Sequence, residues 1–435
     1  MHPSRVIRGR TSQLLSGRRI VVGIAGSIAA VEVPRIVREL LRHGAEVRAV
    51  MSGEAQRILT PEAIQFATGQ PPITHLTGDV EHVSLLGPGG GQADLLLIAP
   101  ATANTIAKIA HGIDDTPVTS FASMALGGGV PILLAPAMHA HMRQNPAIRD
   151  ALATLERWGV GIVASQSAEG EEKLASPEEI AAAVLHALAR SPYRGRSVVV
   201  IGGAAREPVD RVRALSNESS GATAVALAQH AYFRGGTVEL WLGHHSVPVP
   251  SYLPSRGWRS VDDLLRLAAD QRGLLASAAL VIVPAALADY TVVARPGKIS
   301  SRDHPALTLR LRRAEKVLPR LREFAPPPVR LVGFKLEAET TPEALEASAR
   351  RLAGEAGLDW VVADDAATMG SPEIHALVLP PRGGRHWLHG SKFDVAGKLL
   401  DDIGLDIAQQ RTPRPGASGP APRRRAAPTR PRRRR

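Results

Sequence analysis

The first half of the chain alternates short apolar runs with segments of helical periodicity. Residues 19–25, RIVVGIA, form an apolar run that ends at Gly26 and Ser27. Further apolar runs stand at 46–51, 93–99, 130–135 and 160–164, with helical patterns between most of them. Strands that are apolar throughout and alternate with helices are typical of a parallel sheet covered on both faces. We expect such an α/β unit, closed by a helix that Ser176 opens in a capping box with Glu179.

A second alternating pattern starts after a short polar joint at residues 191–196. Residues 197–201 are expected to form a strand that two glycines end, and a helix is expected around residues 221–233. Further apolar runs stand at 237–242, 279–284, 330–334 and 360–363. The sequence therefore predicts two Rossmann-like α/β domains, at 1–190 and 191–410, followed by a tail at 411–435.

Composition narrows the kinds of site that the chain can hold. It has no cysteine, which excludes disulfides, cysteine-ligated zinc or iron–sulfur sites and a catalytic thiol. No apolar run approaches the roughly 18 residues that cross a membrane. The N-terminus has basic residues but lacks the apolar core of a secretion signal. We therefore expect a soluble, cytoplasmic protein.

The net charge of +12 belongs almost entirely to the tail. Residues 411–435 hold ten arginines and no acidic residue, which leaves +2 on residues 1–410. The tail is rich in Pro and Arg and has almost no large apolar side chains, so it cannot fold alone. A solvated tail is the favoured interpretation, and contact with RNA or another polyanion is the alternative. The function must therefore come from the folded part.

Residues suited to binding phosphate follow the predicted strand ends of the first unit. Gly26 and Ser27 follow one strand and open a helix, where backbone N–H groups and a hydroxyl favour an anion. Ser52 follows the next strand, and segments 100–104 and 136–141 follow two others. The G-x-G-x-x-G fingerprint of dinucleotide binding is absent. Because ligands lie beyond the carboxyl ends of strands in open α/β sheets, we expect the site there.

Three segments of the first unit resemble the flavin-containing cysteine decarboxylases. They are GDVEHVSLL at 78–86, PATANTIAKIAHGIDD at 100–115 and APAMHAHM at 135–142. The resemblance implies a flavodoxin-like domain that binds FMN and decarboxylates a cysteine with a free carboxyl group. It implies that His82 is the base and that Asn104 binds the substrate carboxylate. The residues that it implies for FMN follow the strand ends: Gly26, Ser27, Ser52, Ala101 and Thr102.

Two departures from that family concern the last step of the reaction. His139 stands where the family's P-x-M-N-x-x-M-W motif has Asn, and Arg143 stands where it has Trp. The flap cysteine that usually serves as the acid in the final reduction is missing from the short segment 164–180. Either another acid acts, or the final step is impaired. The candidate acids are His139, His141, Glu171 and Lys173, although a structural role for His141 is slightly favoured.

The second unit resembles the phosphopantothenate–cysteine ligases over nearly its whole length. The segment GGAAREPVDRVRALSNESSG at 202–221 carries this resemblance, together with AALADY at 285–290, GKISS at 297–301, VGFKLE at 332–337 and VVADD at 361–365. It implies that Asn217 binds an acyl-nucleotide, that Arg213 binds the substrate or the incoming cysteine, and that Lys298 neutralises phosphate charge. It places Asp289 beside the nucleotide. It also implies nucleotide contacts for Ala314, Glu315, Lys316, Val317 and Phe334.

One pair of nucleotide-binding residues in these ligases has no match in this chain. The family has two further lysines for the triphosphate, on the helix before the VVADD strand. Leu352 and Ala356 fall near their positions. Arg350 or Arg351 is a candidate substitute, and the metal ligands stay unassigned.

Together the two resemblances imply a bifunctional enzyme of coenzyme A synthesis, of archaeal type. The second unit would join 4′-phosphopantothenate to L-cysteine through an acyl-cytidylate, using CTP and Mg²⁺. The first would decarboxylate the product to 4′-phosphopantetheine with FMN. The family also implies trimeric flavoprotein contacts and dimeric ligase contacts, which together build a dodecamer.

Two other interpretations start from the same folds. A flavin prenyltransferase shares the first fold, but the second unit argues against it. The stronger alternative is an active ligase joined to an inactive FMN-binding domain with a regulatory or scaffolding role. The missing flap cysteine and the basic tail motivate this alternative.

Overall fold

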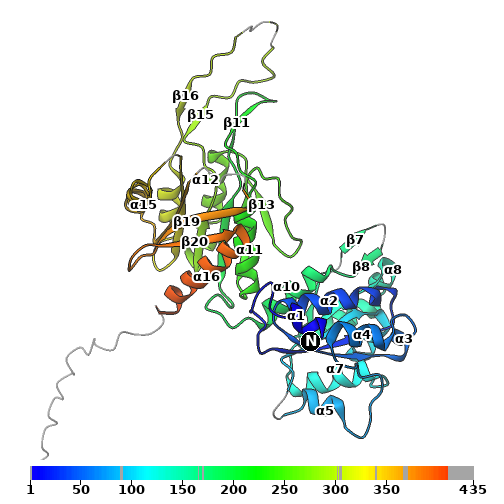
Figure 1. Ribbon diagram of the computed structural model, residues 1–435. Coiled ribbons are helices and arrows are strands. Elements are labelled where there is room, and N and C mark those ends of the chain that lie inside the picture. Colours follow the sequence, from blue (N-terminus) through cyan, green and yellow to red (C-terminus); the bar gives the residue numbers. More distant parts are fainter. Residues whose placement is uncertain are drawn as a thin grey trace, which may run out of the picture.

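The computed structural model describes residues 2–88, 92–164, 166–168, 171–300, 302, 306–338, 340–365 and 371–409. It contains two α/β units that follow one another along the chain (Figure 1). The tail predicted at 411–435 lies outside the described residues. No helix within the described ranges has the length and apolar character needed to cross a membrane.

The sheet of the first unit has five strands, all parallel, in the order β2-β1-β3-β4-β6. Its strands are β1 Arg19–Ile24, β2 Glu46–Met51, β3 Leu95–Ala101, β4 Ile132–Pro136 and β6 Gly161–Ile162. The predicted parallel sheet is confirmed. The edge strand β6 is shorter than the apolar run that predicted it, because only two of its residues pair with β4.

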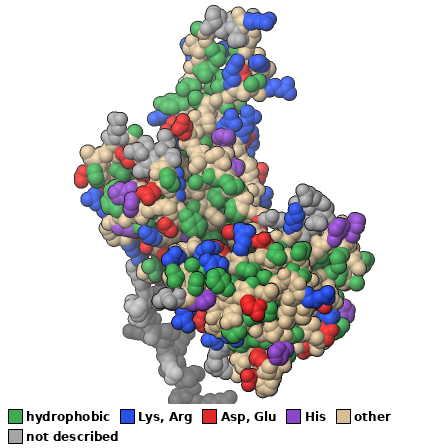
Figure 2. All heavy atoms as spheres, turned by 45° about the vertical axis from the view of Figure 1, so that its right-hand side comes forward, with side chains coloured by type: hydrophobic (Ala, Val, Ile, Leu, Met, Phe, Trp, Pro, Cys, Tyr) green, Lys and Arg blue, Asp and Glu red, His purple; other side chains and the backbone are tan. Residues whose placement is uncertain are grey.

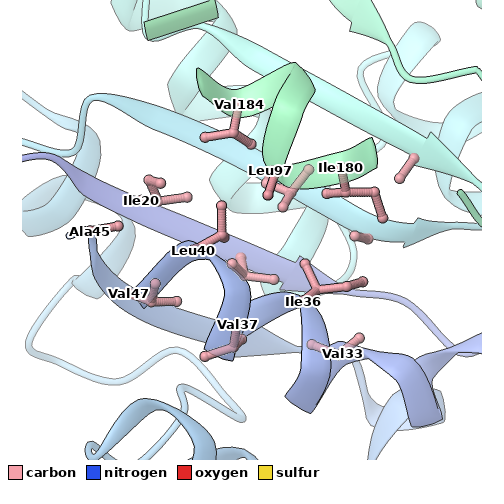
Figure 3. Packing of buried hydrophobic residues seen from close by; sticks show 14 of the residues in the cluster. Ile20, Val33, Ile36, Val37, Leu40, Ala45, Val47, Leu97, Ile180 and Val184 are labelled. Carbon is pink, nitrogen blue, oxygen red and sulfur yellow. The ribbon is translucent and has the colours of Figure 1, made fainter. Parts of the chain in front are cut away.

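Helices cover both faces of this sheet. They are α1 Pro3–Ile7, η1 Ile28–Glu32, α2 Val33–Arg42, α3 Gly53–Gln56, α4 Pro61–Thr68, α5 Glu81–Leu86, α6 Ala103–Ala110, α7 Pro117–Gly128, α8 Ala140–Gln144, α9 Pro146–Arg157 and α10 Pro177–Leu188. Ile20 and Val22 of β1 pack against α2 and α10, as Figure 3 shows for Ile20, Ile36 and Ile180. Val21 points to the other face, toward α6, α7 and α9. Each such side chain contributes about 1.5–3 kcal/mol when it is fully buried.

The predicted capping box at the start of α10 is present. Ser176 Oγ accepts the N–H of Glu179 at 3.2 Å, and the Glu179 carboxylate accepts the N–H of Ser176 at 2.9 Å. A small sheet in the order β5-β8-β7 stands before this helix. Its strands are β5 Met138–His139, β7 Gln166–Ala168 and β8 Glu171–Lys173. The hairpin of β7 and β8 is therefore tied to the segment that follows β4.

The sheet of the second unit has eight strands, in the order β13-β12-β9-β14-β17-β18-β19-β20. They are β9 Ser197–Gly202, β12 Thr237–Leu242, β13 Ser255–Gly257, β14 Leu280–Val283, β17 Arg330–Glu337, β18 Trp360–Asp365, β19 Glu373–Leu379 and β20 His386–Ser391. The strands are parallel up to β18, as the alternating pattern predicts. The last two are antiparallel, which the sequence analysis did not predict. Their connections are too short for the crossover that a parallel pair requires.

Two helical layers cover the second sheet. The helices are α11 Ala222–Phe233, α12 Val261–Asp270, α13 Arg272–Ser277, α14 Val317–Phe324, α15 Pro342–Ala356 and α16 Lys392–Gln409. Val200 packs toward α11 and α16, while Val199 packs toward α12, α13 and α14. Two short hairpins project from this unit (Figure 1): β10 Arg206–Pro208 with β11 Ala214–Ser216, and β15 Tyr290–Val292 with β16 Leu311–Arg313.

The two units meet where α10 packs on α11. The His186 and Tyr232 rings stack with centroids 4.3 Å apart. His186 Nδ1 lies 3.0 Å from the Tyr232 carbonyl oxygen. Phe233 of α11 is 7% exposed and belongs to the core cluster of the first unit. Side chains of both units therefore form one continuous apolar contact.

Candidate active sites at the carboxyl ends of the two sheets

Three hydroxyl side chains follow three neighbouring strands of the first sheet. Ser27 follows β1 and caps η1, accepting the N–H two residues later at 3.3 Å. Ser52 follows β2 and Thr102 follows β3, and each accepts the N–H three residues later at 3.2 Å. Because β2, β1 and β3 are adjacent and parallel, these hydroxyls lie along one edge of the sheet. We call Ser27, Ser52 and Thr102 the cap row.

Backbone contacts bring the loops of the cap row together. The Ser52 N–H donates to the carbonyl of the last residue of β1 at 3.0 Å, and the Ala25 N–H donates to the Pro100 carbonyl at 3.3 Å. A Cβ on Gly26 would lie 2.4 Å from Glu54 Cβ, so only glycine allows this approach. The predicted FMN residues therefore occupy one compact edge.

Ala101 and Asn104 stand at the same edge. The Ala101 carbonyl accepts the Ala137 N–H at 3.1 Å, which joins the loops after β3 and β4. Asn104 lies exposed in the first turn of α6, two residues after the cap Thr102. An amide here can donate to a carboxylate held next to the cap row.

His139 and His141 lie beside the hairpin of β7 and β8, which falls in the segment where the family has its flap cysteine. His139 caps α8, and its Nδ1 accepts the His141 N–H at 3.2 Å. The two rings are 4.9 Å apart between centroids, and both residues are exposed. Lys173 is exposed at the end of β8, while the side chain of Glu171 lies outside the described part of the structure. Of the four predicted acids, His139 and His141 are the two that the structure shows in contact with each other.

His82 lies on a helix between β2 and β3 in the sequence, not in the strand-end loops that carry the cap row. It lies on α5, which packs against α7, and its ring centroid is 6.4 Å from that of Phe121. Its Nδ1 is buried and has no hydrogen-bond partner among the described residues. In the described ranges, no hydrogen bond or ring contact joins His82 to Ser27, Ser52 or Thr102. A ring nitrogen without a partner can accept a proton from a ligand.

Asp210 organises the candidate site of the second unit. It is 2% exposed, and one carboxylate oxygen accepts the N–H groups of Val212 and Arg213 at 2.8 and 2.7 Å. The other accepts Arg213 Nη1 at 2.7 Å and the Ile299 N–H at 3.1 Å. Burial alone would raise the pKa of Asp210, but the N–H groups of Ile299, Val212 and Arg213 outweigh it and hold the pKa at about 2.

This carboxylate brings two predicted site residues together. Arg213 also donates to the Ile299 carbonyl at 3.1 Å, and Lys298 is the residue before Ile299. The side chain of Lys298 is exposed and follows Gly297, whose φ is +80°. Arg213 and Lys298 are therefore held on adjoining segments although they are far apart in sequence.

Asn217 lies between the two halves of the second sheet. Its amide donates to the Leu287 carbonyl at 3.0 Å, which ties the loop after β9 to the loop after β14. Two residues that the sequence analysis did not single out lie next to it. The Ser219 and Ser220 hydroxyls accept the N–H groups of Gly221 and Ala222, each at 3.3 Å, at the start of α11. Their position before a helix within a Gly/Ser-rich segment was the available signal.

The predicted nucleotide residues form a second group in this unit. Lys316 Nζ lies 2.6 Å from Asp289 Oδ1, and the Ala314 N–H donates to the Asp289 carbonyl at 3.0 Å. Glu315 pairs with Arg320 at 3.0 Å, and the buried Val317 begins α14. Phe334 is half-buried on β17, which adjoins β14. Both members of the Asp289–Lys316 pair are exposed, so water screens their attraction and a ligand can rearrange them.

A polar group at the end of β17 links the candidate Arg351 to residues that had no predicted role, Lys335, Glu337 and Ser348. Lys335 Nζ lies 3.1 Å from Glu337 Oε1, which also accepts Ser348 Oγ at 2.5 Å. Arg351 donates to Ser348 Oγ at 3.1 Å, whereas Arg350 pairs with Glu346 on the outer surface of α15. Of the two candidate substitutes for the missing lysines, Arg351 adjoins the carboxyl end of the sheet. Leu352 and Ala356 supply no charge there.

The described residues contain no cluster of three or more His, Asp or Glu side chains that could hold a metal ion by themselves. The Mg²⁺ of the sequence analysis therefore stays a prediction.

Comparison with known proteins agrees with this two-part architecture. Residues 8–189 match the Flavoprotein family, and residues 193–405 match the family described as DNA/pantothenate metabolism flavoprotein C-terminal domain. The coenzyme A biosynthesis bifunctional protein CoaBC of Thermococcus kodakarensis is 38% identical over 405 residues, which cover 93% of this chain and 99% of that protein. The chain belongs to the CoaBC family.

Two further similarities accompany this result. CoaBC of Methanocaldococcus jannaschii is 33% identical over 93% of this chain and 97% of its own length. The solved structure of the FMN-dependent cysteine decarboxylase SpaF is 34% identical, covers 40% of this chain and 99% of its own, and has a TM-score of 0.35.

The prediction of an archaeal-type bifunctional enzyme of coenzyme A biosynthesis is confirmed. The decarboxylase activity belongs to the flavoprotein part and the ligase activity to the C-terminal part. The alternative of an inactive first domain gains no support from CoaBC membership.

Proposed function

We propose that residues 191–410 join 4′-phosphopantothenate to L-cysteine with CTP and Mg²⁺, and that residues 1–190 decarboxylate the product to 4′-phosphopantetheine with FMN. One observation carries this proposal. A single CoaBC chain holds the cap row at the carboxyl end of its first sheet and the Asp210-centred site in the loops of its second unit. Both sites lie where ligands bind in open α/β sheets.

The cap row fits a flavin that carries a phosphate. Each cap oxygen already accepts a backbone N–H, so the Ser27 and Ser52 protons can be donated to a phosphate oxygen. The Thr102 proton can be donated in the same way when Thr105, whose hydroxyl lies 2.9 Å away, is the donor of that pair. Gly26 keeps the neighbouring backbone open to close approach. Ser27, Ser52 and Thr102 would thus hold the phosphate and ribityl chain, with Ala101 beside them. Bound FMN would supply the two-electron oxidation that makes loss of CO₂ easy.

The chain's own residues then hold the substrate and move its protons. Asn104 would donate to the carboxylate that leaves as CO₂, and His82 would take the thiol proton. Because no hydrogen bond or ring contact among the described residues links His82 to the cap row of its own chain, we propose that it completes the site of a neighbouring copy in a trimer. His139 or His141 would return the last proton, since a ring nitrogen of histidine can hold and donate a proton and no cysteine is present.

In the second unit, charge placement accounts for the proposed acyl transfer. Asn217 would bind the acyl-cytidylate, while Arg213 would bind the substrate or the incoming cysteine. Lys298 would neutralise the phosphates, for which an exposed ammonium is suited. Asp289, the segment 314–317 and Phe334 would contact the nucleotide. Dimeric contacts here, added to trimeric contacts of the first unit, would build a dodecamer in the cytoplasm.

The test is a coupled assay on the purified chain. 4′-Phosphopantothenate, cysteine, Mg²⁺ and either CTP or ATP are supplied, and products are followed by mass spectrometry. Formation of 4′-phosphopantetheine with CTP supports both steps, and His139→Asn and His141→Ala then locate the final acid. Accumulation of 4′-phosphopantothenoyl-cysteine would refute the decarboxylase part and leave the ligase part standing. Accumulation of an oxidised enethiol would show that CO₂ is lost but that the final reduction fails, which would refute the formation of 4′-phosphopantetheine.

A further inference from the structure

Four arginines of the second unit line two adjoining hollows. The first hollow has a volume of about 460 Å³ and is lined by Arg211, Arg259 and Arg295. The second, of about 410 Å³, is lined by Arg206, Arg259 and His244. Since Arg259 lines both, we treat them as one site and call it the arginine hollow. Figure 2 shows Lys and Arg side chains gathered on the projecting part of the molecule, with few acidic ones.

Backbone hydrogen bonds fix the segments that carry these arginines. The Arg206 N–H donates to the Arg259 carbonyl at 2.7 Å, and the Arg211 N–H donates to the Gly297 carbonyl at 2.9 Å. The Arg295 N–H donates at 3.0 Å to the carbonyl of Val209, which lies two residues before Arg211. Segments from three regions of the sequence are thus tied around the hollow. The guanidinium groups are exposed, but their Cα positions are set.

The carboxylates nearest to the hollow are already engaged. Glu207 is 3% exposed and accepts the Val261 N–H at 2.8 Å and the Thr291 hydroxyl at 2.6 Å. Asp210 lines the first hollow, but its oxygens accept the Val212, Arg213 and Ile299 donors described above. Among the described residues, none of the four guanidinium groups has an ion pair or side-chain hydrogen bond. The hollow is therefore strongly positive and suited to a dianion.

Guanidinium groups favour phosphate over other anions of similar size. Their planar forks match two phosphate oxygens at once, and several forks around one site favour the doubly charged phosphate monoester. Two of the three substrates of the proposed ligase, 4′-phosphopantothenate and CTP, carry phosphate, so the place of the hollow in the fold must decide between them.

The topology separates the hollow from the predicted nucleotide residues. Asp289 and Phe334 follow or lie on β14 and β17, on one side of β9. The hollow adjoins His244 and Trp258, which follow β12 and β13 on the other side. Asn217, which ties the two sides, lies between them. A substrate whose carboxylate reacts near Asn217 can extend its far end into the hollow.

We propose that the arginine hollow binds the 4′-phosphate of 4′-phosphopantothenate and makes the ligase selective for the phosphorylated substrate. This inference rests on the proposed ligase function. It assigns to Arg206, Arg211, Arg259 and Arg295 a recognition task that is separate from acyl transfer at Asn217 and from the nucleotide group.

The test combines the double variant Arg211→Gln/Arg259→Gln with the full-length chain. Initial ligase rates are measured against 4′-phosphopantothenate and against CTP, and calorimetry measures binding of 4′-phosphopantothenate and of unphosphorylated pantothenate. Loss of each charge-assisted contact weakens binding about tenfold, so the KM for 4′-phosphopantothenate should rise by at least that factor. The KM for CTP and the binding of pantothenate should stay unchanged.

A matched control and a conservative variant guard against loss of fold. Arg256→Gln removes an arginine of β13 that pairs with Glu239 at 3.1 Å outside the hollow, and it should leave every constant unchanged. Arg211→Lys/Arg259→Lys keeps the charge and should recover part of the affinity. A rise in the KM for CTP, or equal losses for both pantothenate forms, would overturn the proposal. If the unmodified chain makes no ligase product, the proposed function fails. Calorimetry with 4′-phosphopantothenate and pantothenate still shows whether the arginine hollow binds the phosphate group.

Discussion

In the first unit the candidate site consists of helix caps that follow β1, β2 and β3 directly, each satisfied within three residues. In the second unit the candidate site consists of loop residues joined by side chains. One such bond, from Ile299 to Asp210, spans 89 residues. The first arrangement is assembled locally and repeats along the sheet edge. The second depends on a few buried carboxylates that connect distant segments.

This contrast predicts how damage spreads in each unit. Loss of one cap hydroxyl removes one local bond and about 1 kcal/mol of helix stability. Loss of a carboxylate that connects two loops frees both loops and the functional side chains that they carry. Mutations should therefore have graded effects in the first unit's cap row and abrupt effects in the second unit's loops.

The largest expected effect concerns His82, the proposed base of the first unit, which is not part of the cap row. His82→Asn should lower decarboxylation of 4′-phosphopantothenoyl-cysteine about thousandfold, because a general base contributes in that range. Ligase activity should be unchanged. Mass spectrometry of the product formed from supplied 4′-phosphopantothenoyl-cysteine measures the effect. Retained decarboxylation would remove His82 from the mechanism.

A mixing experiment tests whether His82 serves a neighbouring copy. The His82→Asn variant is mixed under subunit exchange with an Asn104→Ala variant, each of which should be inactive alone. If each site takes His82 from one copy and Asn104 from another, mixed assemblies regain part of the activity. No recovery, with exchange shown by native mass spectrometry, would place both residues in one copy's site.

The next largest effect tests the long-range arrangement of the second unit. Asp210→Asn replaces an oxygen that accepts two donors with a group that donates, so the loops of Arg213 and Lys298 should separate. We expect ligase activity to fall about a hundredfold, as loss of more than one charge-assisted bond implies. Flavin absorbance and decarboxylation should not change. Initial-rate kinetics with 4′-phosphopantothenate and cysteine check this.

A carboxylate with only local bonds provides the control. Asp263 accepts the Ser260 N–H at 3.1 Å in the capping box of α12 and connects no distant loop. Asp263→Asn should cost about 1 kcal/mol of stability and leave the ligase constants unchanged. If both variants lose activity equally, the distinction between local and long-range support is wrong for this unit.

The sequence predicted the elements that depend on local patterns. The apolar runs placed the parallel strands except β13, whose three residues are exposed, and Ser176 with Glu179 predicted the start of α10. The antiparallel pair β19 and β20 was missed, because Glu373 and His375 are exposed and interrupt an apolar run. Strand β19 lies inside the sheet, between β18 and β20, but its first residues alternate in burial and give no continuous apolar signal.

The parts of the candidate sites that follow strand ends could be predicted from the sequence, and the parts that depend on contacts between distant segments could not. The cap row follows strand ends, so its members could be placed on one edge from the sequence. The partners of Asp210 could not be identified, since no periodicity connects residue 210 with residue 299. Arg351 was named as a candidate beside Arg350, but its link through Ser348 to Glu337 could not be predicted, because strand β17 and helix α15 must first pack together.

A third prediction concerns His230 of α11, a buried residue of the second unit that contacts the distant helix α16. Arg234 donates to His230 Nδ1 at 2.9 Å, and the ring packs on Phe393 of α16 with centroids 4.1 Å apart. Burial, and then the charge of Arg234, lower the pKa of His230 to about 3. An unfolded histidine has a pKa of about 6.5. The folded state therefore holds this ring neutral, while the unfolded state binds a proton below that pH.

The sign of the effect follows from this difference in proton binding. The contribution of neutral His230 is fully present above pH 6.5 and is lost as the pH falls toward 3, by at most about 1.4 kcal/mol per pH unit. Urea unfolding of the second unit between pH 7 and pH 5 should show this slope. His230→Gln should reduce it, and exposed His111→Gln should not. An equal slope in His230→Gln would contradict the assignment.

The smallest expected effect returns to the cap row. Thr102→Val keeps the shape of the side chain but removes the hydroxyl that caps α6 and that we assign to the FMN phosphate. Loss of one hydrogen bond to a charged phosphate costs about 1.5 kcal/mol or more, which corresponds to at least about tenfold weaker flavin binding, measured by fluorescence titration. Thr60→Val removes an equivalent cap from α4, which does not follow a strand, and should lose similar stability but no flavin affinity. If both variants lose flavin equally, the cap row contributes only helix stability, and the flavin phosphate must be held elsewhere. If only Thr102→Val does, the local caps of the first unit form part of the flavin site.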